Sequence, residues 1–234
     1  MGKFLASLVL ATLGWFPLAN AQTSMVVVEL YTSQGCSSCP AADVILSEIA
    51  EDRNVIALGL HVDYWDYLGW RDGLARPEFT KRQEIYNVAL KSRYRLVTPQ
   101  MIIQGRDYVA GAKRRKLLEY IEMLQNMPEA AALDIERRGS QLKISLAPVP
   151  GQNVEGAVLH VVRFDPLVKV AIEGGENRGR HMKYTNTVTR WDTIAEWNGK
   201  DTVELSYDLS DGDNLAVIVQ AKGHGPILAA RRLD

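Results

Sequence analysis

A continuous apolar run leads directly into the two cysteines of this chain. Residues 25–32 read MVVVELYT, and the motif GCSSCP follows at residues 35–40. An uninterrupted stretch of apolar and β-branched residues is typical of a strand buried on both faces. Residues 41–50 then carry four aliphatic side chains at helical spacing. The chain must therefore adopt a fold that places a Cys-x-x-Cys pair between a buried strand and a helix.

The first 21 residues have the composition of a cleavable secretory signal. They combine Lys3, an apolar run over residues 4–13 and the sequence ANA at residues 19–21. The apolar run is short and interrupted by Gly and Pro, and no later window holds about 18 uninterrupted apolar residues, the length of a membrane span. We expect a periplasmic or secreted chain that starts near Gln22 and leaves the membrane after cleavage. An uncleaved anchor is the alternative.

Charge and length exclude some classes of partner and of fold. The formal net charge is −1, which gives no electrostatic reason to expect nucleic acid or an anionic membrane as a partner. A mature chain of about 210 residues can bury a core without disulfide staples. The two cysteines are therefore not needed for bulk stability, and we expect no organic cofactor.

Residues 22–128 alternate between strand and helix patterns. After the first strand and helix come an apolar run at 55–62, a helical pattern at 77–92, a short hairpin at 96–110 and a helical pattern at 113–127. The order β-α-β-α-β-β-α predicts a mixed α/β layer with parallel pairing of the early strands.

From residue 129 the pattern changes to short strands. Leu142, Ile144 and Leu146 alternate with polar residues, as in a half-buried strand. Similar segments follow at 157–164, 168–173, 182–191, 202–209, 215–221 and 227–232. They predict a separate antiparallel β-sandwich over residues 129–234, with a boundary near residues 127–131.

The position of the cysteines favours dithiol–disulfide exchange. At a helix start, free backbone N–H groups and the positive end of the helix dipole stabilise a thiolate. We expect Cys36 to be the exposed nucleophile and Cys39, within the first turn, to resolve the mixed disulfide. Pro40 fits this place because its missing N–H has no partner inside the helix. The expected partners are protein or small-molecule thiols and disulfides.

Two other readings of the same cysteines stay open. In the first, the pair is an inert disulfide, as is common in secreted proteins, and the β-rich part is a binding module. In the second, the thiolates carry Cu(I) in a metallochaperone, with His61 as the third ligand. The sequence offers no second Cys-x-x-Cys to complete a zinc site, and we assign no resident metal.

Four motifs resemble a known family. SQGCSSCPAAD, HVDYWDYLGW, TPQMIIQG and GENRGR resemble bacterial secreted thioredoxin-like proteins of unknown function. The resemblance implies a thioredoxin fold in which Cys36 is the nucleophile, Cys39 resolves, and Pro99 is a cis-proline preceded by Thr98. Gln34 and Gly35 stand where cytoplasmic thioredoxins have a tryptophan, which leaves the sulfur open to approach.

The loop after the second strand supplies candidates for the substrate side. Tyr64 or Trp65 could form the wall of a cleft, and His61 or Asp63 could move protons near Cys39. The alternative is an Ω-like loop whose aromatic side chains pack onto the body of the domain. We assign Gln34, Trp65, Thr98 and Pro99 to substrate binding.

Two further stretches have simpler interpretations. Residues 174–180, GGENRGR, predict a strand connection or a contact between the two halves of the chain, because they open no helix and match no phosphate loop. The basic run at residues 113–116 is typical of a solvated helix start, with a docking surface as the alternative.

Overall fold

The computed structural model describes residues 24–233, so the predicted signal at residues 1–21 lies outside the described residues. In chain order the elements are β1 (Val26–Thr32), α1 (Pro40–Ile49), β2 (Val55–His61), the short 3-10 helix η1 (Asp66–Leu68), α2 (Pro77–Ala89), β3 (Gln100–Ile103), β4 (Asp107–Ala110), α3 (Arg114–Gln125), β5 (Ala131–Arg138), β6 (Gln141–Pro148), β7 (Ala157–Ala171), β8 (His181–Trp197), β9 (Val203–Asp208), β10 (Leu215–Ala221) and β11 (Ile227–Leu233). Within these residues no helix has the length and apolar character needed to cross a membrane.

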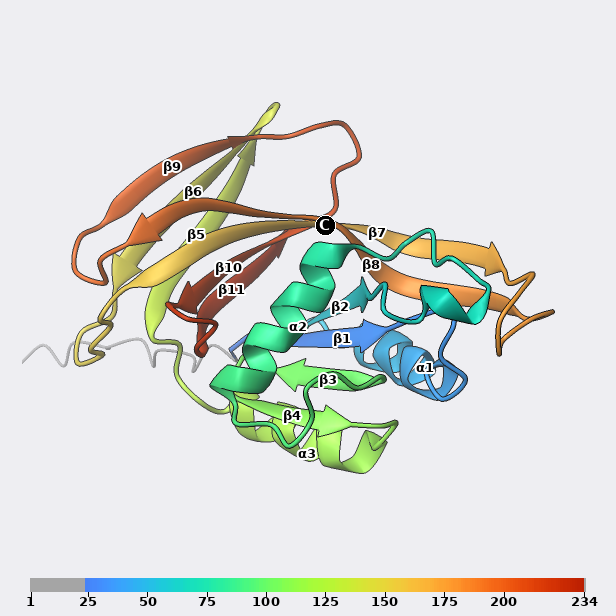
Figure 1. Ribbon diagram of the computed structural model, residues 1–234. Helices are drawn as coiled ribbons and strands as arrows, with labels where there is room; N and C mark the ends of the chain where they lie inside the picture. Colours follow the sequence, from blue (N-terminus) through green and yellow to red (C-terminus); the bar gives the residue numbers. More distant parts are fainter. Residues whose placement is uncertain (1–23, 234) are drawn as a thin grey trace, which may run out of the picture.

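The strands of the described chain form two sheets (Figure 1). The larger has eight strands in the order β11-β10-β7-β8-β2-β1-β3-β4, and the smaller has three in the order β5-β6-β9. In the larger sheet β2 runs parallel to both β1 and β8, whereas the other neighbours are antiparallel. The protein is thus a mixed α/β structure with a second, antiparallel sheet.

The first half of the described chain, residues 24–128, agrees with the sequence prediction in the order of its strands and α-helices. The second half, residues 129–233, differs from the prediction. Strands β7, β8, β10 and β11 do not form a separate unit: they continue the sheet of β1–β4. The prediction also missed β5 and split β7 into two strands. The partner of β8 in the first half lies more than a hundred residues away, a distance over which local patterning carries no signal. The proposed division at residues 128 and 129 itself stays a prediction.

Each half of the large sheet has its own cover on one face. Helices α1 and α3 pack on β1–β4 through a cluster of aliphatic residues that includes Leu46, Met101 and Leu117. On the other half, the three-stranded sheet packs against β7, β10 and β11 through residues such as Ile144 and Val217. A sandwich therefore exists, but one of its layers belongs to the shared sheet.

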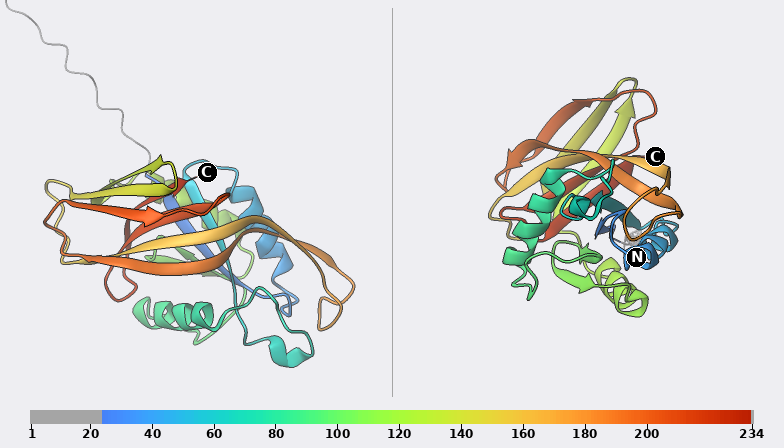
Figure 2. Two further views of the ribbon diagram at one scale, coloured as in Figure 1. Left: turned by 90° about the horizontal axis from the view of Figure 1, so that it is seen from above. Right: turned by 45° about the vertical axis from the view of Figure 1, so that its right-hand side comes forward.

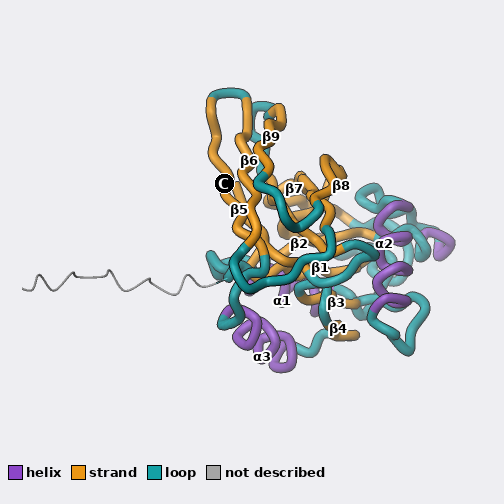
Figure 3. Tube along the Cα trace, turned by 90° about the vertical axis from the view of Figure 1, so that its left-hand side faces the viewer, coloured by secondary structure: helices purple, strands orange, loops and turns teal. Residues whose placement is uncertain are grey.

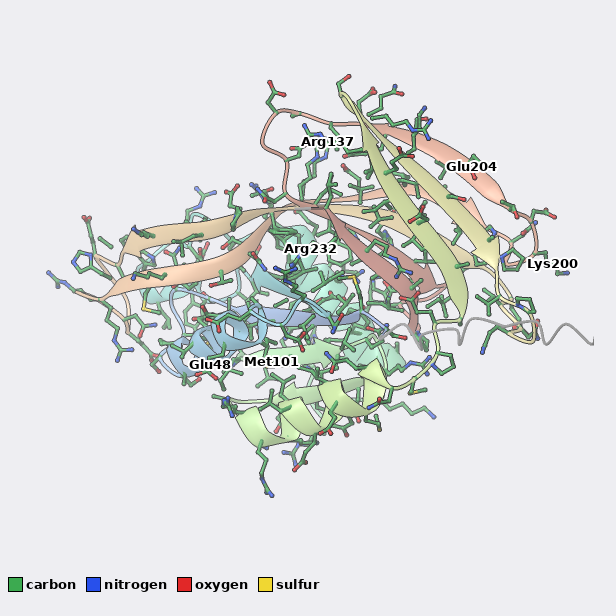
Figure 4. The ribbon with its side chains drawn as sticks, turned by 180° about the vertical axis from the view of Figure 1, so that it is seen from behind. Glu48, Met101, Arg137, Lys200, Glu204 and Arg232 are labelled. Atoms are coloured by element: carbon green, nitrogen blue, oxygen red, sulfur yellow. A yellow bond between two sulfur atoms is a disulfide. The ribbon has the colours of Figure 1, made fainter. Side chains whose placement is uncertain are left out.

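Figure 3 shows the three-stranded sheet standing apart from α2 and α3. In Figure 4 Met101 lies on the α3 side, whereas Arg137 and Glu204 mark the small sheet.

The two halves of the large sheet meet at a narrow contact between β2 and β8. The paired residues are Gly59 and Thr187. A Cβ on Gly59 would lie 3.3 Å from the carbonyl oxygen of Thr185, so the close approach of the two backbones favours glycine. Beside it, Asn186 adopts a φ of 46° and donates from Nδ2 to the carbonyl oxygen of Ala57 at 2.9 Å. Asparagine tolerates this left-handed conformation better than most residues.

A buried ion pair joins the two halves of the large sheet on the face opposite to α1 and α3. Arg82 of α2 donates from Nε and Nη2 to the Glu29 carboxylate of β1, at 2.7 and 2.9 Å. The same guanidinium donates to Gln220 of β10 at 3.1 Å and lies 3.7 Å from the ring centroid of Trp191 on β8. Tyr86 donates to Glu29 at 2.7 Å. One charge pair therefore connects α2 with three strands.

The electrostatics of this pair depend on mutual compensation. Burial alone raises the pKa of the Glu29 carboxyl, but the charge and hydrogen bonds of Arg82 outweigh it, so the pKa lies below its usual value. Removal of one partner would leave the other charge buried without compensation.

We predict that Arg82→Met lowers the free energy of unfolding by about 3–5 kcal/mol, because Glu29 would remain buried and unpaired. Urea denaturation followed by circular dichroism measures this change. Arg115→Met is the matched control, since its side chain is 94% exposed and forms only an i,i+4 pair. Similar losses in the two variants would contradict the assignment of Arg82 as a structural centre.

Candidate functional site

The two cysteines form a disulfide at the start of α1. Cys36 and Cys39 are bonded to each other, with their Cα atoms 5.4 Å apart. Cys39 is the residue immediately before the helix and Pro40 is the first helical residue. The carbonyl oxygen of Cys39 accepts from the backbone N–H groups of Ala42 and Asp43, at 2.8 and 3.1 Å. The predicted arrangement of strand, turn and helix around the pair is confirmed.

The exposure predicted for Cys36 is wrong. Its exposed fraction is 1% and that of Cys39 is 0%, whereas Ser37 and Ser38 between them are exposed. The prediction rested on the position of Cys36 before a helix start and on the absence of a tryptophan beside it in the sequence. Two other segments pack against the turn that carries the cysteines, and both follow it at a distance in the chain.

The first covering segment is the tip of the β7–β8 hairpin, residues 172–180. Asn177 is 2% exposed and donates from Nδ2 to the carbonyl oxygens of Gln34 and Cys36, both at 2.9 Å. Its neighbour Glu176 accepts from the backbone N–H of Ser37 at 3.3 Å. Figure 2 shows β7 and β8 running from the small sheet to the end of the molecule that carries α1. The predicted contact between the halves is confirmed.

Glycines allow the hairpin tip to pack closely against the loop after β2. A Cβ on Gly174 would lie 2.9 Å from the carbonyl oxygen of Gly69, and one on Gly175 would lie 3.2 Å from Cβ of Trp70. Trp70 in turn donates from Nε1 to Oε1 of Gln34 at 2.7 Å. The tip, the aromatic loop and the cysteine turn therefore form one packed unit.

The second covering segment is the aromatic loop itself, through Trp65. A Cβ on Gly35 would lie 3.1 Å from Cβ of Trp65, so the tryptophan packs on the cysteine turn. The Nε1 of Trp65 donates to Oγ1 of Thr98 at 2.7 Å. The peptide bond between Thr98 and Pro99 is cis, and both residues are buried. The structure thus brings Trp65 against Gly35 and Thr98, three residues that the sequence placed near the site.

A buried polar cluster lies next to the disulfide. Asp43, on α1 four residues after Cys39, accepts from the hydroxyl of Thr32 at 2.9 Å. His61 pairs through Nδ1 with Oδ2 of Asp72 at 2.7 Å, and that same oxygen accepts from the backbone N–H of Gln34 at 2.8 Å. Asp72 therefore connects the end of β2 to the cysteine turn.

Asp43 is the most perturbed acid of this cluster. Burial raises the pKa of its carboxyl to about 6, despite the opposing influence of His61 and of the Thr32 hydrogen bond. Within the described residues, Oδ2 of Asp43 and Nε2 of His61 have no hydrogen-bond partner. Tyr184 of β8 packs edge-on against His61, with ring centroids 4.5 Å apart. Asp43 is therefore a buried acid with a raised pKa beside the cysteine turn.

The remaining predicted residues have other positions. Asp63 accepts from the hydroxyl of Thr80 on α2 at 2.6 Å, which fixes the loop rather than serving the cysteines. The basic residues at the start of α3 form exposed pairs, such as Arg114 with Glu48 at 2.7 Å. Among residues 24–233, no three His, Cys, Asp or Glu side chains group in a way that could hold a metal ion.

Sequence reasoning missed Asp43, Asp72 and Asn177. Asp43 gives a local signal, because it is an acid on a helical segment whose neighbours Ala42 and Ile45 are buried. Asp72 and Asn177 give none. They reach the cysteine turn only through the folding of a loop and of a hairpin tip 141 residues away from Cys36.

The sequence profile of a family described as a "Protein of unknown function (DUF1223)" matches residues 27–220. The chain belongs to this family. Among solved structures, the chain is similar to a protein of Agrobacterium tumefaciens determined by X-ray crystallography, with 30% identity and a TM-score of 0.77. That match covers 91% of this chain and 96% of the other. The covered part of this DUF1223 member includes the cysteine turn, the aromatic loop and most of the covering hairpin.

A more distant structure shares the fold alone. It is described as HBP35 of Porphyromonas gingivalis, with 15% identity, a TM-score of 0.61, and coverage of 90% of this chain and 75% of that one. The comparison with curated proteins gave no match. The chemistry of this DUF1223 protein must therefore be argued from its own site.

We predict that Asp43→Asn stabilises the oxidised protein above pH 6 but not below pH 4. A raised pKa means that the folded state prefers the protonated acid, so ionisation of Asp43 destabilises the fold as pH rises through about 6. The stability of the variant relative to the wild type should therefore grow by up to about 3 kcal/mol between pH 4 and pH 8. Urea denaturation across this range measures it.

Asp211→Asn is the control, because the side chain of Asp211 is exposed and the substitution makes the same chemical change outside the buried cluster. A pH profile for Asp43→Asn that runs parallel to the wild type would rule out a buried, ionisable acid at this position.

Proposed function

We propose that this protein catalyses thiol–disulfide exchange at Cys36 and Cys39 in a thioredoxin-like arrangement. The observation that carries the proposal is the disulfide between these residues at the start of α1, directly after the buried strand β1. The order β2-β1-β3-β4 and the position of α1 after β1 support the thioredoxin-like assignment.

Local chemistry favours an active disulfide over a staple. The bond closes a loop with a sequence separation of 3, and so short a loop restricts the unfolded chain little. The start of a ten-residue helix offers unpaired N–H groups and a positive dipole end. Both stabilise the thiolate form, which is the nucleophile and the leaving group in exchange.

The reaction would proceed in two exchange steps. A substrate thiolate attacks Sγ of Cys36, the bond between Cys36 and Cys39 breaks, and its electron pair leaves on Cys39 as a thiolate. A second substrate thiolate then attacks the substrate sulfur of the mixed disulfide and releases Cys36 as a thiolate. The substrate thiols become a disulfide, and the protein becomes a dithiol. The reverse sequence reduces a substrate disulfide.

Asp43 supplies a proton store for the buried sulfur of this scheme. Cys39 is fully buried, so a thiolate formed there needs a proton donor inside the protein. Asp43 lies one helical turn further on, and its pKa of about 6 keeps part of the acid protonated near neutral pH. Transfer of this proton to Cys39 leaves Asp43 as a carboxylate near the His61–Asp72 pair.

The setting of the site fits an oxidising compartment. Stable disulfides belong mainly to secreted and periplasmic proteins, which agrees with the signal predicted at residues 1–21. We propose the periplasm or the exterior as the location, and cysteine-containing proteins or small thiols as partners.

A second candidate function keeps the disulfide inert and assigns a binding role to the β-rich part. The burial of Cys36 favours it, because a thiol-reactive site must admit its substrate. The copper alternative has no comparable support. Within the described residues, no group of three His, Cys, Asp or Glu side chains that could hold the ion includes His61, its predicted third ligand.

We predict that Cys36→Ser abolishes reduction of a peptide disulfide by the prereduced protein, whereas Cys39→Ser accumulates a mixed disulfide with the substrate peptide. The reason is that Cys36 forms the intermolecular bond and Cys39 resolves it. Mass spectrometry under non-reducing conditions measures both. Ser37→Ala is the matched control, because this exposed residue lies between the cysteines and should retain exchange. Turnover by the Cys36 variant, or a wild-type disulfide inert to every thiol, would favour the binding module.

A further inference from the structure

The tip of the β7–β8 hairpin contacts the main chain on both sides of Cys36. Asn177 donates to the carbonyl oxygens of Gln34 and Cys36, and Glu176 accepts from the N–H of Ser37. Backbone C=O and N–H groups beside a reactive residue are the groups to which an extended peptide binds in β-augmentation. In this structure the hairpin tip forms hydrogen bonds with these backbone groups.

The side chain of Asn177 has the same chemical groups as a peptide bond. Its amide Nδ2 donates both hydrogen bonds at 2.9 Å, as backbone N–H groups would. Its Oδ1 is buried and has no partner among the described residues. An incoming polypeptide can replace these hydrogen bonds one for one, whereas a small thiol without amide groups leaves the carbonyl oxygens of Gln34 and Cys36 unpaired.

The contact between the hairpin tip and the cysteine turn consists of a few hydrogen bonds and backbone packing. Asn177 is buried, but Glu176 and Arg178 beside it are exposed, and the hydrogen bond from Ser37 to Glu176 is long at 3.3 Å. The tip packs on the aromatic loop through Gly174 and Gly175, which bring backbone rather than side chains to Gly69 and Trp70. Ile172 at the base of the tip is buried, whereas residues 174–180, GGENRGR, contribute no apolar side chain to the contact.

We propose that residues 174–180 form a substrate-selective cover, in which Asn177 stands in for the backbone of a polypeptide substrate. The site therefore exchanges disulfides preferentially with cysteines in extended polypeptide segments and reacts more slowly with small thiols. This inference rests on the proposed exchange function and names its substrate class. Asn177 is a positioning residue, because it holds the chain on both sides of Cys36 and does not take part in the exchange.

Asn177→Ala tests the cover through a comparison of two substrates. One is 2-mercaptoethanol, and the other is an unstructured peptide that contains one cysteine. Each is reacted with the oxidised protein, and the second-order rate constant for opening of the disulfide is measured. We expect the wild type to prefer the peptide thiolate by about tenfold, the effect of two exchanged hydrogen bonds. Asn177→Ala should accelerate 2-mercaptoethanol about tenfold, because its reaction then no longer breaks two hydrogen bonds that a small thiol cannot replace.

Two further variants keep the test independent of folding. Glu176→Ala alters an exposed residue and removes only the contact with Ser37, so it should accelerate 2-mercaptoethanol by about threefold. Arg178→Ala is the control in the same tip, because its side chain is exposed, and it should leave both rates unchanged. Circular dichroism establishes that each variant is folded. Equal rates for the two substrates in the wild type, or unchanged 2-mercaptoethanol rates in both Asn177→Ala and Glu176→Ala, would overturn the proposal.

Alkylation separates the failure of the cover from the failure of the exchange function. The prereduced protein is treated with iodoacetamide, which reports access to Cys36 without any exchange reaction. Faster alkylation in Asn177→Ala together with the predicted exchange rates supports the proposal. Faster alkylation of Asn177→Ala, with no disulfide exchange by any variant, would contradict the proposed exchange function. The proposed substrate selectivity would then fail as well. Exchange rates that are the same in the wild type and in Asn177→Ala would contradict only the proposed role of residues 174–180 as a cover.

Discussion

The buried pair of Glu29 and Arg82 is the interaction on which the remaining structure depends. Glu29 occupies the middle of β1, the strand that leads into the cysteine turn, and its partner comes from α2. Because the guanidinium also contacts Gln220 and Trp191, the pair positions strands of the second half against the first. A charge pair in such a place tolerates few alternative packings, since every other arrangement leaves a charge without its partner. The position of β8, and with it the hairpin that reaches the cysteines, follows from this constraint.

The exchange function that we propose places two conflicting requirements on the site. A leaving thiolate benefits from the start of a helix and from a nearby acid, and both are present around Cys39. An attacking substrate needs access, which the closed hairpin tip denies to Cys36. The chemistry and its control thus come from different parts of the chain: β1 and α1 supply the sulfur atoms, and the tip between β7 and β8 covers them.

Sequence reasoning reached the local features and failed on the distant ones. The strand, the turn and the helix around Cys36 could be predicted because each follows from apolar periodicity and from Pro40. The union of the two halves of the large sheet could not, because it depends on contacts between distant segments with no shared pattern, such as the approach of Gly59 to β8 and the contacts of Arg82 with Gln220 and Trp191. The same limit applies to Asn177, whose position in a glycine-rich turn looks like that of any loop residue. The exposure predicted for Cys36 failed for this reason.

The separation of the cysteines from their cover along the chain also affects how the protein is made. A chain is synthesised from its N-terminus, and early segments begin to fold before later ones exist. Residues 26–49 therefore present two thiols at a helix start while the hairpin that buries them has not yet been synthesised. During this interval Cys36 and Cys39 meet the oxidants and cysteines of their surroundings without selection. On the proposed exchange function, the nascent protein is thus chemically less selective than the finished one, and its range of thiol partners narrows when the last third of the chain arrives.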